Sequence, residues 1–221
     1  MNLVNIHTHR LEQPCAALQV LSLDATALTG RSAEDCVAYL DAYPTNVLFS
    51  VGVHPWKAAQ AAPADERMRA LLSHPRVLLL GEIGLDKCCD VPFDRQLAVF
   101  EQQLQLASEM GKPVILHVVR AMDEVLALKK RYTGVACWVL HAFRGNSQQA
   151  RQYLQHGFYL SFGLRYRPEA LQICPPGRFF LETDDEPQAS IEQHYRQVAA
   201  SLGICIEDLS EHISLEAVLG K

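Results

Sequence analysis

The sequence lacks three features that would place it among membrane, exported or polyanion-coating proteins. Lys and Arg number 20 against 25 Asp and Glu, for a net charge of −5, so no global positive field would concentrate a polyanion on the surface. No apolar run approaches the roughly 18 residues of a membrane span, and no basic segment with a long apolar stretch opens the chain. We therefore expect a cytoplasmic protein with no membrane partner.

The sequence is also without a paired-cysteine motif and without the glycine-rich nucleotide motifs. Its seven cysteines are scattered, odd in number and free of any CxxC spacing, so reduced thiols are expected. Neither GxGxxG nor GxxxxGK[ST] occurs. The remaining composition, 49% hydrophobic over 221 residues, is ordinary for a globular chain and predicts one domain over residues 1–221.

Short apolar runs typical of buried strands recur along the chain, with helical stretches between them. They are Leu3–Ile6, Ala17–Leu23, Val47–Val53, Val77–Ile83, Val114–Val118, Ala136–Leu140, Phe158–Phe162 and Arg178–Leu181. The clearest helix pattern is Phe93–Met110, which ends before Gly111 and Pro113. Apolar strands alternating with helices indicate a parallel sheet, and about eight repeats favour an α/β fold of the TIM-type (β/α)8 barrel class. An open doubly wound sheet is the alternative.

The helices at the two ends of the predicted fold differ from a regular barrel. Few residues separate His9 from the second strand, so we expect a shortened or missing first helix. A helix is predicted over Ser32–Tyr43, and two closing helices over Glu192–Leu202 and Glu207–Leu219, joined around Gly203.

Potential metal ligands lie at the ends of six of the predicted strands or directly after them. They are His7 and His9, His54, Glu82, His117, His141, and Asp184 in the Glu182–Asp184 segment. In a barrel the carboxyl ends of all strands open onto one face, so we expect these groups to converge. Six buried polar strand ends would be costly without a partner, which favours metal binding over a purely structural role.

The types of these side chains indicate the chemistry. His-x-His on an extended segment places both imidazoles on one side of the strand. Imidazole with carboxylate suits Zn²⁺, Mn²⁺, Fe²⁺ or, with more oxygen ligands and water, Mg²⁺. Glu82 has two oxygens and can bridge two ions, an arrangement used for phosphate ester cleavage. Asp184 can bind metal, accept the proton of an attacking water, or do both. The remaining histidines fall in helices or loops, where a structural role is expected: His74, His156, His194 and His212.

Seven ordered blocks resemble the TatD-like metal-dependent hydrolases of the amidohydrolase superfamily. The blocks are Asn5–His9, Ser50–Pro55, Gly81–Asp86, Pro113–His117 with Arg120, His141–Phe143 with Gly145, Leu160–Gly163 and Glu182–Asp184. The resemblance runs nearly end to end. It implies a TIM-barrel hydrolase with one to three divalent cations that acts on phosphoester bonds, often as a Mg²⁺-dependent deoxyribonuclease.

The resemblance also implies roles for particular residues. His7, His9, Glu82 and Asp184 would hold one ion, and Glu82, His117 and His141 a second. His54 and Arg120 would face a phosphoester substrate such as single-stranded DNA, with Glu82 and Asp184 as the catalytic carboxylates.

Two departures from the family pattern bear on the substrate. Trp56 follows Pro55 where relatives commonly have His, and an aromatic side chain there can stack on a base or pack as a lid. Asp185 and Glu186 follow Asp184 where relatives usually have Ala-Pro; if they face the site they would repel a phosphate-rich polymer and favour a small phosphorylated compound.

Two other functions stay open at this level. The same barrel with a similar histidine-rich site can polarise a carbonyl, as in an amide or lactone hydrolase. A binding or scaffold protein that keeps the metal without turnover is the other. The sequence does not determine which metal is native, how many ions bind or how many chains associate.

Overall fold

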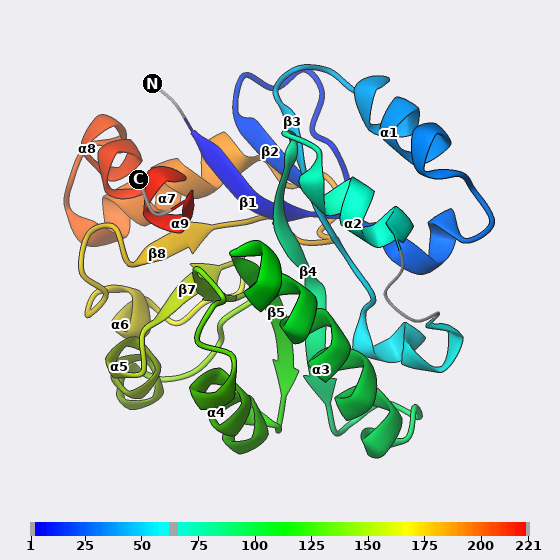
Figure 1. The fold of residues 1–221 in the computed structure, drawn as a ribbon. Coiled ribbons are helices and arrows are strands. Elements are labelled where there is room, and N and C mark those ends of the chain that lie inside the picture. Colours follow the sequence, from blue (N-terminus) through cyan, green and yellow to red (C-terminus); the bar gives the residue numbers. More distant parts are fainter. Residues whose placement is uncertain (1–2, 62–65, 220–221) are drawn as a thin grey trace. The chain divides into compact units, whose positions relative to one another are not determined.

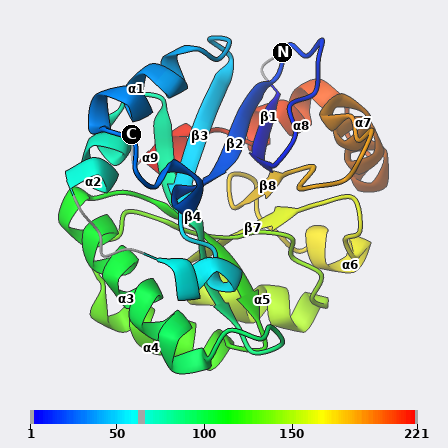
Figure 2. The same cartoon turned by 90° about the vertical axis from the view of Figure 1, so that its right-hand side faces the viewer.

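A computed structural model describes residues 3–61 and 66–219 (Figures 1 and 2). Eight strands follow one another in the sheet in chain order, β1 to β8, and every strand pair whose register is described is parallel. This topology confirms the predicted (β/α)8 class. Contacts within the chain group it into two compact units, which are described separately. The prediction of one domain over residues 1–221 stays a prediction.

The central unit comprises residues 22–138 of the sequence. Its elements are η1 (Ala25–Leu28), α1 (Ala33–Asp41), β3 (Val47–Gly52), η2 (Pro55–Gln60), α2 (Glu66–Ser73), β4 (Val77–Asp86), α3 (Phe93–Met110), β5 (Val114–Val119) and α4 (Met122–Arg131). All ten residues of β4 are buried, as expected for a strand covered on both faces. Helix α3 lies along β4 (Figure 1), and Figure 2 shows α1 and α2 side by side.

Helix α3 has the bounds that its sequence pattern predicts. Val99, Phe100 and Leu104 are buried on one face, as the helical spacing of apolar residues requires. Gly111 ends the helix in the left-handed conformation, at φ 61°, and its N–H donates to the Ala107 carbonyl. The helix therefore ends where a residue without Cβ is available.

The terminal unit comprises the chain up to residue 21 and from residue 139 onward. It contains β1 (Val4–Thr8), α5 (Ser147–Gln155), β7 (Phe158–Phe162), α6 (Pro168–Leu171), β8 (Phe179–Leu181), α7 (Ile191–Leu202), α8 (Ile206–His212) and α9 (Glu216–Leu219), while β2 (Leu18–Asp24) begins in it and β6 (Trp138–Leu140) ends in it. Thr8 at the end of β1 pairs in parallel with Asp184, which follows β8. The first and last strands are thus neighbours.

Two expectations about helices have different outcomes. The segment between β1 and β2, all of it described, contains no helix, as predicted. The prediction of a single helix over Glu207–Leu219 is wrong, because residues 213–215 are not helical and separate α8 from α9. The His212 carbonyl accepts from the N–H of Gly177 at 2.8 Å, and the Ser214 hydroxyl accepts from the N–H of Glu216 at 3.1 Å. These bonds replace the helical ones that a continuous helix would need.

The search for membrane-spanning helices covered residues 3–61 and 66–219. Within these ranges, no helix has the length and apolar character needed to cross a bilayer.

Candidate metal centres

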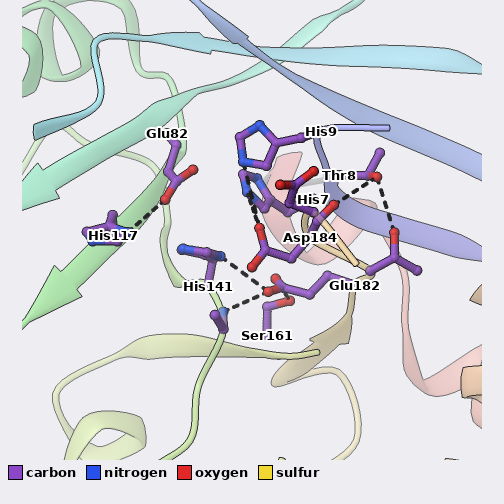
Figure 3. Close-up of polar contacts among 12 residues, drawn as sticks. His7, Thr8, His9, Glu82, His117, His141, Ser161, Glu182 and Asp184 are labelled. Carbon is purple, nitrogen blue, oxygen red and sulfur yellow. Dashed lines mark hydrogen bonds and ion pairs between the residues drawn. The ribbon is translucent and has the colours of Figure 1, made fainter. Parts of the chain in front are cut away.

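Three side chains at strand ends meet in the terminal unit (Figure 3). His7 lies on β1, His141 follows β6 and Asp184 follows β8, and one ligand atom from each lies within 4.8 Å of the others. Asp184 Oδ1 is 3.7 Å from Nε2 of both His7 and His9. Two imidazole nitrogens and a carboxylate oxygen at this separation fit a divalent cation, with His9 in place to add a further nitrogen.

The backbone aims Asp184 at this set. Asp184 is held at φ 53°, a left-handed conformation that is unusual for a residue with Cβ and costs about 1–3 kcal/mol. Its N–H donates to the His7 carbonyl at 3.1 Å, and its carbonyl accepts from the His9 N–H at 3.0 Å. Bonds to β1 on both sides therefore stabilise the strained position.

Glu182 is fully buried and contacts the ring of His141. Its Oε1 accepts from the Ala142 N–H at 2.8 Å and lies 3.2 Å from His141 Nδ1, while Oε2 accepts from the Ser161 hydroxyl (Figure 3). Burial alone would raise the pKa of Glu182, but the charge and hydrogen bond of His141, with His7 and Ser161, outweigh burial and lower that pKa. Glu182 is thus a charged carboxylate that fixes the orientation of His141.

A second set lies in the central unit. Glu82 Oε1 on β4 is 3.2 Å from His54 Nε2 and 3.0 Å from His117 Nδ1, and these three residues offer ligand atoms within 4.8 Å of one another. The resemblance implies that His54 faces the substrate, and this role stays a prediction; its position beside Glu82 and His117 would also allow it to bind a cation. The predicted second ion, which pairs His117 with His141 through Glu82, involves residues of both units and stays a prediction.

Asp86, at the end of β4, contacts the outer nitrogen of His117. Asp86 Oδ2 lies 3.1 Å from His117 Nε2 and accepts from the Trp56 indole N–H at 2.7 Å, and Oδ1 accepts from the Cys88 N–H at 2.7 Å. Burial would raise the pKa of Asp86, but its bonds to Trp56, Cys88 and His117 lower it on balance. The carboxylate is therefore held charged beside a candidate ligand.

Gly84 lets β4 pass close to His117. Its φ is 147°, and a Cβ at this position would collide with the His117 carbonyl oxygen. The β5 neighbour of Gly84 in the sheet register is His117 itself. A side chain at Gly84 would thus displace the backbone of a candidate ligand.

Gly84→Ala is expected to lower the free energy of unfolding by at least about 2 kcal/mol, from strain and overpacking together. Gly30→Ala is the matched control, because Gly30 also has positive φ, at 84°, but open space around it. Urea unfolding gives the free energy of unfolding of both variants. The loss in Gly30→Ala measures the backbone strain alone, and the additional loss in Gly84→Ala measures the overpacking against His117. Equal losses would show that the His117 carbonyl relaxes without cost.

Comparison with known proteins places the chain in a family. The model of the family described as "TatD related DNase" matches residues 6–217. The chain belongs to the TatD-related DNase family. The family match thus agrees with the resemblance shown by the strand-end blocks, and two relatives have names that describe them as metal-dependent hydrolases.

Several TatD relatives define how far the similarity extends. The "3'-5' ssDNA/RNA exonuclease TatD" of Cronobacter turicensis is 34% identical over 196 residues, which cover 80% of this chain and 72% of that protein. The "uncharacterized metal-dependent hydrolase YabD" of Bacillus subtilis is 32% identical, over 61% of this chain and 57% of that protein. For YcfH of Escherichia coli K12, described in the same words, the values are 31%, 77% and 66%. The matched part of the chain thus spans from just over half to under three quarters of these relatives.

Solved structures show the same fold. The TatD homologue YJJV from Escherichia coli superposes with a TM-score of 0.77 at 21% identity, covering 99% of this chain and 95% of that one. A TatD-family hydrolase from Entamoeba histolytica gives a TM-score of 0.75 at 13% identity, over 99% and 98%. At these identities the likeness shows the TIM-barrel fold alone.

The acidic residues after Asp184, where the resemblance leads us to expect Ala-Pro, contact arginines. Arg10 Nε donates to Asp185 Oδ1 at 2.7 Å, and Arg165 lies 2.9 Å from Glu186 Oε1. The hydrogen bond and charge of Arg10 lower the pKa of Asp185. The two acids after Asp184 therefore carry arginine partners, which weakens the expected repulsion of a phosphate polymer.

Arg120, which the resemblance places at the substrate, and Arg144 are both available to an anion. Arg120 follows β5 at φ 54° and Arg144 follows β6, and both are exposed. Neither has a carboxylate within 4.0 Å in the described part of the chain, whereas Lys87 pairs with Glu124 at 2.5 Å. Arg120 thus keeps the substrate-facing role predicted for it as a proposal.

Side-chain contacts are described for two of the four histidines that we expect to have structural roles. His74 Nε2 lies 3.2 Å from Asp41 Oδ1. His194 is buried with Nε2 2.9 Å from the Phe162 carbonyl oxygen, and burial lowers the pKa of its imidazole. Neither belongs to a group of candidate ligands in the described ranges.

Proposed function

We propose that this chain hydrolyses phosphodiester bonds of single-stranded nucleic acid with divalent cations. The observation that carries the proposal is the pair of histidine–carboxylate sets at strand ends, one in each unit, whose donor types fit such cations. The match to the TatD-related DNase model supports the reaction class. The exonuclease name of the Cronobacter relative supports the substrate.

The proposed ligands are those that the resemblance implies. His7, His9, Glu82 and Asp184 would hold one ion and Glu82, His117 and His141 another, with Mg²⁺, Mn²⁺ or Zn²⁺ as the candidate cations. When bound, such cations lower the pKa of a water and neutralise charge on a phosphoryl oxygen. His54, which lies 3.2 Å from Glu82, either faces the substrate or joins the ligands.

The remaining steps fall to side chains of the protein. Asp184 has about a third of its side chain exposed, so its carboxylate can accept a proton from an attacking water. Arg120 can bind a phosphate through two parallel N–H donors, which positions the bond to be broken. Because Asp185 and Glu186 are paired with arginines, a phosphate chain is not excluded from this side of the terminal unit.

The state of the cysteines supports the predicted compartment. None of the seven cysteines forms a disulfide in the structure, and Cys88 and Cys205 are exposed. Free exposed thiols persist where glutathione keeps them reduced, which supports the proposed cytoplasmic location.

A substrate panel tests the proposal. Protein with Mn²⁺ restored is expected to shorten single-stranded DNA and RNA oligonucleotides, and inorganic phosphate is expected to inhibit the reaction as a product analogue. Turnover of small phosphate esters alone would contradict the nucleic-acid part. Turnover of amide or lactone substrates with no phosphate inhibition would replace the proposal with the carbonyl alternative.

A further inference from the structure

Asp86 is a buried acid that the proposed ligand sets do not use. Only 3% of the residue is exposed, and it ends the strand that carries Glu82. Each of its oxygens has a fixed donor: the Cys88 N–H on Oδ1 and the Trp56 indole N–H on Oδ2, both at 2.7 Å. A buried carboxylate with this many partners is held in one orientation.

His117 lies between this carboxylate and Glu82. Its Nδ1 is 3.0 Å from Glu82 Oε1, and its Nε2 is 3.1 Å from Asp86 Oδ2. When a carboxylate accepts the proton of one ring nitrogen, the other nitrogen is the one left to bind a cation. Asp86 on Nε2 thus directs Nδ1 toward Glu82 and His54.

Trp56 adds the last contact, and it does so from an exposed position. Its side chain is 58% exposed, so burial in the core does not account for its placement. The ring meets His54 edge to face at 4.9 Å and His117 at 5.7 Å between centroids. Its N–H reaches the same Asp86 oxygen that contacts His117. The indole therefore touches both histidines of the set and the acid behind one of them.

We propose that Asp86 and Trp56 are positioning residues for the candidate metal centre of His54, Glu82 and His117. Trp56 holds Asp86 in place, and Asp86 orients His117 with Nδ1 toward the cation. The inference rests on the proposed function, because it requires that His54, Glu82 and His117 bind a metal. It assigns to Trp56 a role as hydrogen-bond donor that neither base stacking nor a lid would require.

The test uses Mn²⁺ titration calorimetry of the intact chain in an Asp184→Ala background, which weakens the terminal set. Mn²⁺ is the probe because soft thiolates, of which this chain has seven potential sources, favour other metals. Asp86→Asn is expected to weaken Mn²⁺ binding about 10–100-fold, the usual effect of losing such a partner. Trp56→Phe, which keeps the ring and removes the N–H, should weaken binding roughly 3–10-fold.

Lys57→Ala is the matched control, because Lys57 is exposed beside Trp56 in η2 and should leave Mn²⁺ affinity unchanged. A second readout is independent of metal. The chain has two tryptophans, so its ¹⁵N spectrum contains two indole N–H signals. Trp56→Phe should remove one of them, and Asp86→Asn should shift that same signal and leave the Trp138 signal in place.

The outcomes separate this inference from the proposed function. Lack of Mn²⁺ binding in the wild-type chain would overturn both. Binding in the parent that is equally strong in folded Asp86→Asn and Trp56→Phe would overturn the positioning role and leave the proposed function standing. If Asp86→Asn does not fold, Trp56→Phe carries the test, and unchanged Mn²⁺ affinity in that variant overturns the inference.

Discussion

Glu82→Ala is expected to lower phosphodiester hydrolysis by roughly 10³-fold or more, because loss of a single group that stabilises transition-state charge already costs about 10²–10³. Glu82 is the carboxylate of the central set, with Oε1 within 3.2 Å of nitrogens on both His54 and His117. Removing it leaves two histidines without the negative charge that attracts a cation. The measurement is kcat/KM for release of nucleotides from a labelled oligonucleotide.

Two variants sharpen this prediction. Glu82→Gln keeps the size of the side chain but not its charge, so it should lose activity nearly as fully as Glu82→Ala. Glu34→Ala removes an exposed acid from α1 of the same unit and should leave activity unchanged. Full activity in both Glu82 variants, with unchanged thermal unfolding, would remove Glu82 from the mechanism.

Glu182→Ala is expected to lower the free energy of unfolding by about 2–5 kcal/mol, because at least two buried donors, each costing about 1–3 kcal/mol when unsatisfied, lose their acceptor. Glu182 is fully buried and accepts hydrogen bonds from the Ala142 N–H and the Ser161 hydroxyl while lying 3.2 Å from His141 Nδ1. Without the carboxylate, these buried donors lose their acceptor. Urea unfolding measures the loss.

The pH dependence distinguishes a charge effect from a packing effect. Because the folded-state pKa of Glu182 is lowered, its charge stabilises the protein above the unfolded-state pKa of about 4.3, and this contribution is lost as the pH falls through the folded value. The stability difference between wild type and Glu182→Gln should therefore shrink as the pH is lowered below about 4.3. A difference that stays constant with pH would assign the effect to packing.

Glu169→Ala provides the control for Glu182, since Glu169 is an exposed acid in α6 of the same unit. Its replacement should change stability by less than about 0.5 kcal/mol. An equal loss in this variant would show that the terminal unit responds to any change of acidic charge.

The eight strands and three of the four helices given ranges in the sequence analysis followed from the sequence pattern. All eight apolar runs are strands, and α3 has the predicted bounds, because residues apolar on both faces and a regular helical stripe leave few alternatives. The α8–α9 break could not be predicted in this way. It depends on a hydrogen bond that the N–H of Gly177, distant in sequence, donates to the His212 carbonyl.

The sequence brings the candidate ligands to strand ends, where the structure gathers them, but their roles as ligands stay predictions and the carboxylates that contact them were missed. His7, His141 and Asp184 come together in one unit, and His54, Glu82 and His117 in the other, as strand-end positions indicate. The supporting roles of Glu182 and Asp86 depend on which ring nitrogen each carboxylate faces, and spacing alone does not give that. One signal was present: Glu182 and Asp184 are two residues apart, so an extended chain directs both to the same side.

The most direct test of the account is hydrolysis of a 5'-labelled single-stranded DNA by metal-stripped protein before and after Mn²⁺ is restored, with Glu82→Ala alongside. The account predicts no cleavage without metal, progressive shortening once Mn²⁺ is added, and no shortening by the variant. Cleavage that proceeds equally without metal, or equally in Glu82→Ala, would contradict it.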